Sequence, residues 1–67
     1  MIGLTINGQP RQFSEPLSLC DLVTQLDLAG KRIAIERNGS IVPRSQFESL
    51  ALADGDALEI VVAVGGG

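Results

Sequence analysis

The first quarter of the chain alternates apolar and polar residues. Residues 2–6 place Ile, Leu and Ile on one face, which is typical of a half-buried strand. Asn7-Gly8 then predicts a tight hairpin, because both residues tolerate the positive φ angles of a type I′ turn. That turn sets the start of the first strand opposite Phe13. Pro10 places the second strand, residues 9 to about 14, at a sheet edge, because proline cannot donate to a ladder.

A single amphipathic helix is predicted next. Ser18 and Asp21 have the spacing of a capping box, in which the two side chains satisfy backbone N–H groups of the first helical turn. Leucines and a valine then recur at helical spacing over residues 19–26 and form one apolar stripe. Ala29-Gly30 is predicted to end the helix, because glycine readily adopts the left-handed conformation found after helix C-termini.

The middle of the chain predicts a second hairpin and a short helical turn. Residues 33–36 alternate as a strand, and Asn38-Gly39 gives the turn that follows it. A return strand at residues 41–42 is stopped by Pro43. Residues 45–48 are predicted to form one helical turn that is capped by its serine and buries its phenylalanine.

The last strand is predicted to lie inside the sheet. After a turn at Asp54-Gly55-Asp56, residues 57–64 are apolar on nearly both faces, as central strands are. We place this strand beside the first one and parallel to it. The expected fold is a two-layer α+β domain of the β-grasp (ubiquitin-like) type, with a mixed four- to five-stranded sheet packed on one main helix. Residues 1–64 form this domain and residues 65–67 a flexible C-terminal glycine tail.

Composition then limits the chemistry. The chain has 67 residues, no His and one Cys, which excludes an intrachain disulfide, a Cys/His zinc cage and catalysis by a Ser-His or Cys-His pair. Five basic and eight acidic residues give a net charge of −3, without the basic stripe and stacking aromatics of a nucleic-acid binder. Neither a signal peptide nor a membrane span is expected, so we predict a cytoplasmic protein without a membrane partner.

The terminal glycines are the strongest candidate for function. Without Cβ atoms, Gly65, Gly66 and Gly67 form a chain thin enough to enter a narrow tunnel in another protein. The segment ends in a carboxylate, which adenylation by ATP would convert into a mixed anhydride open to nucleophiles. The alternative is an idle, frayed chain end. A β-grasp domain directly before the glycines favours the functional interpretation.

Two other motifs are interpreted as structural. Cys20 flanks the apolar stripe of the helix, and no Lys, Arg or His adjoins it to lower the pKa of its thiol. A small core residue is therefore favoured over a reactive sulfur carrier. Asp54-Gly55-Asp56 has too few ligands for a calcium loop, so a turn is favoured over a metal or catalytic carboxylate site.

Two surface features remain open between docking and ordinary exposure. Arg44, after Pro43, either contacts a partner or is simply solvated. Val61 and Ala63 point to the sheet face that the helix leaves uncovered, where Thr5 and Ala34 are the expected neighbours. An apolar patch there would be a docking surface, and scattered apolar residues would not.

The chain resembles the ThiS family of sulfur carriers over essentially its whole length. The resemblance is carried by residues 4–8 (Leu-Thr-Ile-Asn-Gly), 34–39 (Ala-Ile-Glu-Arg-Asn-Gly), 41–44 (Ile-Val-Pro-Arg), 54–56 (Asp-Gly-Asp) and 66–67 (Gly-Gly). The Asp-Gly-Asp turn and the final glycines are shared with the molybdopterin carrier family MoaD. The Val-Pro-Arg element and the short length favour ThiS.

This resemblance implies a function in the biosynthesis of thiamine. A ThiF-like adenylyltransferase would use ATP and Mg²⁺ to activate the carboxylate of Gly67, and a cysteine desulfurase-type system would supply the sulfur that forms a thiocarboxylate. A ThiG-like synthase would take that sulfur into the thiazole ring, with Gly65 and Gly66 threading its active site. The chain would then be a co-substrate that binds no cofactor, is not an enzyme, and is monomeric when free. The alternatives are a MoaD-like carrier for molybdopterin and a ubiquitin-like interaction or conjugation module.

Overall fold

The first hairpin forms as its alternating pattern predicts. The computed structural model describes residues 1–63 and pairs β1 (Ile2–Ile6) with β2 (Gln9–Phe13), with Ile2 opposite Phe13. The turn residues Asn7 and Gly8 have φ angles of 51° and 84°, both in the left-handed region that a type I′ turn requires. β2 lies at the edge of the sheet, as Pro10 predicts.

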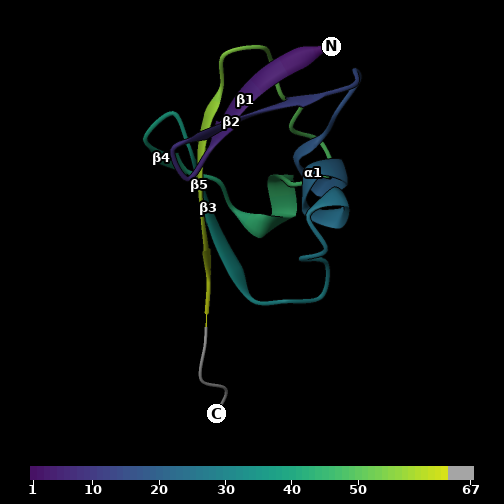
Figure 1. The fold of residues 1–67 in the computed structure, drawn as a ribbon. Helices are drawn as coiled ribbons and strands as arrows, with labels where there is room; N and C mark the ends of the chain where they lie inside the picture. The colour runs from purple at the N-terminus through teal and green to yellow at the C-terminus, as the bar shows by residue number, and fades with distance from the viewer. Residues whose placement is uncertain (64–67) are drawn as a thin grey trace.

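The remaining strands complete a mixed five-stranded sheet. They are β3 (Ile33–Arg37), β4 (Ser40–Ile41) and β5 (Ala57–Val62), and the order across the sheet is β2-β1-β5-β3-β4. β5 is central, parallel to β1 and antiparallel to β3. Figure 1 shows α1 on one side of the sheet, and no helix or strand of residues 1–63 covers the other side. The predicted β-grasp class is confirmed, and Val64, the predicted end of the last strand, lies outside the described residues.

The helix begins as predicted but ends earlier. In α1 (Leu19–Gln25) the capping box is present: the Asp21 N–H donates to Ser18 Oγ at 3.0 Å, and the Ser18 N–H donates to Asp21 Oδ2 at 3.1 Å. The predicted end at Ala29-Gly30 is wrong. Asp27, with φ 62°, takes the left-handed position after the helix instead.

A Schellman motif explains this earlier end. The N–H of Asp27 donates to the Thr24 carbonyl at 3.1 Å, and the N–H of Leu28 donates to the Val23 carbonyl at 2.9 Å. These two bonds satisfy carbonyls at the end of the helix, and Asp is one of the few residues other than Gly that tolerate the left-handed conformation. Gly30 also has a positive φ, 84°, but belongs to the loop that leads into β3.

The short helical turn is a 3₁₀ helix, η1 (Arg44–Gln46), which starts one residue before the predicted range. Pro43, in an extended conformation, precedes it, and no side chain caps it, so the predicted cap at Ser45 is wrong. Phe47 is buried in the hydrophobic core, as predicted. The return strand β4 likewise begins one residue earlier than its pattern predicted, at Ser40.

The core lies between the sheet and α1. Its members are the inward-facing residues of β1, β2, β3 and β5, the stripe of α1 and three residues from the loops and the η1 region. The buried apolar residues are Ile2, Leu4, Ile6, Phe13, Leu17, Leu19, Leu22, Val23, Ile35, Phe47, Leu52, Leu58 and Ile60. Val62 faces the same side as Leu58 and Ile60, but it is 37% exposed because it lies at the end of the strand.

Candidate functional site

The C-terminal glycine segment, which is predicted from the sequence to be functional, follows shortly after the end of β5. Val62, the last residue of β5, lies opposite Ile33, and the N–H of Ala63 donates to the Arg32 carbonyl at 2.9 Å. The backbone is therefore hydrogen-bonded to the segment at the start of β3 as far as Ala63. Gly65, Gly66 and Gly67 lie outside the described residues, and their roles stay predictions.

The side chain of Asn7 extends the contact between β1 and β5. The ladder between these strands has only two register pairs and ends at Ile6 and Leu58. Beyond it, Asn7 Oδ1 accepts a hydrogen bond from the Ile60 N–H at 2.7 Å, and Asn7 Nδ2 donates to the Ile60 carbonyl at 3.1 Å. The side-chain amide thus replaces the next residue of a strand and satisfies both backbone groups of Ile60.

Asn38 has a comparable role on the other side of β5. Its backbone N–H donates to the Ala57 carbonyl at 2.8 Å, and its Oδ1 accepts from the Ala57 N–H at 2.9 Å. Both asparagines belong to Asn-Gly hairpin turns, with the same φ of 51°. The turns therefore hold the central strand as well as reversing the chain. This second role was not predicted, because the partners are up to 53 residues apart in the sequence.

Asp56 holds the turn at the start of β5 in place. Its side chain is buried and accepts hydrogen bonds from Arg37 Nε at 2.9 Å, the Ala53 N–H at 2.9 Å and Asn38 Nδ2 at 3.1 Å. Burial by itself raises the pKa of Asp56, but the three hydrogen bonds and the charge of Arg37 outweigh it and hold that pKa below its usual value. The Asp54-Gly55-Asp56 motif is thus a turn, as expected, with Gly55 at φ 91° and a buried carboxylate at its end.

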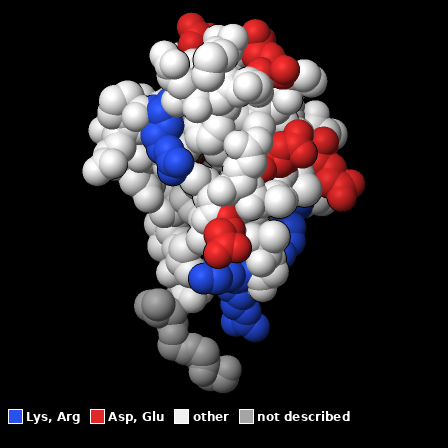
Figure 2. Space-filling model, turned by 45° about the vertical axis from the view of Figure 1, so that its right-hand side comes forward, with Lys and Arg blue, Asp and Glu red and all other residues white. Residues whose placement is uncertain are grey.

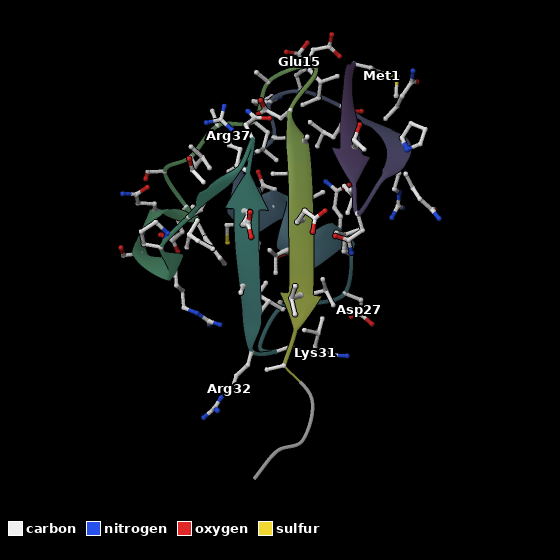
Figure 3. All side chains as sticks on the ribbon, turned by 90° about the vertical axis from the view of Figure 1, so that its left-hand side faces the viewer. Met1, Glu15, Asp27, Lys31, Arg32 and Arg37 are labelled. Carbon is white, nitrogen blue, oxygen red and sulfur yellow. The ribbon has the colours of Figure 1, made fainter. Side chains whose placement is uncertain are left out.

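The predicted apolar residues lie at the end of β5, on the sheet face that α1 leaves uncovered, and Figure 3 views the sheet from that side. Val61 is 61% exposed and lies opposite Ala34, as expected, and Ala63 is also exposed. Thr5 is opposite Ala57, so the expectation that it neighbours Val61 is wrong. Further along, two exposed carboxylates, Glu36 and Glu59, lie directly opposite each other. Like charges in this position are unfavourable unless a partner or solvent compensates them.

Arg44 and Cys20 both line a groove on the side of the sheet that carries α1. The groove has a volume of about 400 Å³ and lies between α1, the loop before β3 and η1. One Arg44 Nη donates to the Lys31 carbonyl at 3.3 Å, which holds η1 to that loop. Cys20 is half-buried and packs against the core, in agreement with its structural interpretation. This groove was not predictable from the sequence, because its walls come from three separate segments.

Residues 1–63 offer little else for chemistry. In this range no three Asp, Glu or Cys side chains are grouped so that they could hold a metal ion. No helix in the same range is both long and apolar enough to cross a membrane. Every buried polar side-chain atom of the described residues has a hydrogen-bond partner.

Comparison with known proteins identifies the family. The sequence profile of the ThiS family matches residues 4–67. The sulfur carrier protein ThiS of Bacillus subtilis is 32% identical over 65 residues, which are 96% of this chain and 98% of that protein. The crystal structure of the thiamine biosynthesis protein ThiS from Geobacter metallireducens has a TM-score of 0.83 at 33% identity and covers 98% of this chain and 100% of that one.

A larger protein contains a similar segment. Thiazole synthase of Paramagnetospirillum magneticum is 44% identical over 64 residues, which are 96% of this chain but 20% of that protein, so the chain spans about a fifth of this relative. The profile match runs to the last residue and includes the terminal glycines, and the solved structure has the same fold. The chain therefore belongs to the ThiS family.

Proposed function

We propose that this chain is a sulfur carrier whose reactive group is the carboxylate of Gly67, and that it supplies sulfur for the thiazole ring of thiamine. The observation that carries the proposal is the family match, which extends through Gly66-Gly67 to the end of the chain. A relative named as a sulfur carrier, similar over nearly its full length, supports the same function.

The proposed chemistry takes place in three steps at the carboxylate of the main-chain terminus. A Gly67 carboxylate oxygen attacks the α-phosphate of ATP, with Mg²⁺ bound by the activating enzyme, and pyrophosphate leaves. The terminal sulfur of a cysteine-derived persulfide then attacks the acyl carbon, and AMP leaves. A thiol reductant cleaves the remaining S–S bond and releases the thiocarboxylate. The chain enters these steps as a co-substrate, and the enzymes that bind it supply the catalysis.

The end of β5 suits this function because it gives the partner a fixed reference point. Backbone hydrogen bonds hold the chain up to Ala63, and Gly67 is the fourth residue after it. Fully extended, four residues span at most about 14 Å. A partner that docks on the body therefore determines how deep the terminal carboxylate reaches into its active site, which is the positioning that a carrier requires.

The uncovered sheet face is the proposed docking surface for a ThiF-like activating enzyme. Val61 and Ala63 form its apolar part, next to the strand end from which the tail follows. The opposed carboxylates Glu36 and Glu59 lie on the same face. A partner with a basic group beside an apolar patch would bury Val61 and relieve the repulsion between the two carboxylates.

Intact-mass measurement tests the proposed function. The purified chain is incubated with a ThiF-like enzyme, ATP, Mg²⁺ and a cysteine desulfurase with cysteine, and it is expected to gain the mass difference between one sulfur and one oxygen. A variant that lacks Gly66-Gly67 is the matched control and should not change in mass. Loss of the added sulfur upon incubation with thiazole synthase would complete the proposal. Transfer to molybdopterin synthase alone, or attachment of the chain to lysines, would contradict it.

A further inference from the structure

Three of the five cationic side chains gather at the end of the molecule where β5 ends. Lys31 and Arg32 precede β3, and the Arg32 carbonyl accepts the hydrogen bond of Ala63. Arg44 joins them through its bond to the Lys31 carbonyl. Figure 3 places Lys31 and Arg32 beside the end of β5, and Figure 2 shows positive side chains at that end and most acidic ones farther up.

This clustering runs against the charge of the chain as a whole. The net charge is −3, yet among residues 1–63 only Asp27 and Glu48 bring side-chain carboxylates to this end or to its groove. The body farther from the tail holds the other two cations and six carboxylates. The molecule is therefore polarised, with a positive end where the tail begins and a negative remainder.

The cations are also available to a partner. Among residues 1–63, none of these three side chains forms an ion pair with a carboxylate, whereas Arg37 is paired with Asp56 and Arg11 lies over the ring of Phe13. All three are exposed. Lys31 and Arg44 also border the groove, whose apolar lining includes Val23, Leu28, Ile33 and Phe47. A concave apolar surface with cations at its rim suits a segment that carries both apolar and acidic side chains.

We infer that this cationic end docks against an acidic segment of the thiazole synthase, at the mouth of the channel that receives the tail. The inference rests on the proposed function, since it needs an enzyme that accepts the glycine tail. The synthase is the partner because a thiazole synthase contains a segment similar to this chain. Carboxylates around the mouth would pair with Lys31, Arg32 and Arg44 while the tail points inward.

A phosphate of a nucleotide or substrate is a poorer match for these cations. When the four residues after Ala63 are extended in a channel, the reacting carboxyl group lies about 14 Å from the body. Phosphates that act at that group are then buried in the active site, beyond the side chains of the body. Carboxylates at the channel mouth are the anions that the cationic end meets.

A pair of charge-matched variants tests this inference. In the first, Lys31, Arg32 and Arg44 are all replaced by Gln. In the second, Gln9→Glu, Arg11→Gln and Gln12→Glu make the same change in net charge on β2, at the far edge of the sheet. Circular dichroism and thermal melting confirm that both variants fold. Binding to the intact thiazole synthase is then measured by titration calorimetry from about 50 mM to about 500 mM salt.

The first variant is expected to bind about tenfold more weakly at low salt and to lose most of the salt dependence of the native chain. The second is expected to bind within about twofold of it. Equal weakening of both variants, or native affinity in the first, would overturn the inference, as would absence of binding by the native chain. Sulfur transfer at saturating synthase tests the proposed function separately. If the first variant binds with native affinity and transfers sulfur, the proposed docking site is wrong but the proposed function stands. If the native chain binds tightly but transfers no sulfur, the proposed function is wrong, whereas the measured binding still supports the docking site.

Discussion

Replacement of Asp56 by Asn tests how the entrance to β5 is held. The carboxylate accepts two hydrogen bonds at Oδ2, from Arg37 and the Ala53 N–H, and one at Oδ1, from Asn38. An Asn side chain has one acceptor oxygen, which can take the place of Oδ2. Its amide group then faces the Asn38 amide, and two donors meet. Asn38 cannot turn over without losing its bond to the Ala57 N–H.

The expected loss of stability follows from these contacts. One hydrogen bond disappears, and the others lose the negative charge that strengthens them. Hydrogen bonds to charged groups contribute about 1.5–3 kcal/mol, so we expect Asp56→Asn to lower the free energy of unfolding by about 2 kcal/mol at pH 7. A 67-residue domain has about 3–10 kcal/mol in total, so the loss is a large share of it.

Urea unfolding followed by circular dichroism measures this loss. With an m-value of about 1 kcal/mol/M, the midpoint should fall by about 2 M. Glu48→Gln, an exposed change that removes one carboxylate charge and no side-chain hydrogen bond among residues 1–63, is the control and should leave the midpoint nearly unchanged. A midpoint shift for Asp56→Asn as small as that of the control would refute the reasoning.

The same pair of proteins has a pH dependence of known sign. The pKa of Asp56 is lower in the folded chain than in the unfolded one, so its ionised form stabilises the fold. That stabilisation is complete above the unfolded pKa of about 3.9 and is lost as the pH falls through the lower folded value. The difference between native chain and Asp56→Asn should therefore be constant near neutrality and shrink below pH ~4. A difference that grows on acidification would contradict the proposed role of the charge.

Four further variants test the stability of the folded body and the function of the glycine tail separately. Asn7→Gly keeps the left-handed turn but removes both bonds to Ile60, and it should lower the free energy of unfolding by about 1–2 kcal/mol in urea titrations. Asp27→Gly relieves the left-handed strain after α1 and should raise stability by about 0.5–1 kcal/mol; a decrease would contradict the Schellman assignment. One bulky residue added after Gly67 should abolish sulfur loading, measured by intact mass, with an unchanged melting temperature. Cys20→Ala should leave loading intact, and loss of loading with a normal melt would contradict its structural role.

The order of the strands was predictable because it depends on short-range sequence signals. Two Asn-Gly turns set two hairpin registers, and a segment that is apolar on both faces must be central. The end of the helix was not predictable in the same way. Gly30 is the stronger left-handed residue by type, but Leu28 is the residue that returns to the Val23 carbonyl, and this fixes Asp27 in that position.

The surroundings of the tail were less accessible to sequence reasoning. The terminal glycines are visible in the sequence, whereas Asp56 contacts Arg37 and Asn38, which are 19 and 18 residues away along the chain. The cluster of Lys31, Arg32 and Arg44 forms only when η1 packs against the loop before β3. A charge total of −3 even points the other way, because a sum over the chain contains no information about where the charges lie.

The central position of β5 has a mechanical consequence. A partner that holds the glycine tail would pull along the axis of β5, which is bonded to β1 and Asn7 on one side and to β3 and Asn38 on the other. Such a pull shears both rows of hydrogen bonds at once, whereas a pull on an edge strand can open one bond at a time. The fold therefore spreads a force applied at the end of β5 over the whole sheet, so that the body resists unfolding when this strand is pulled.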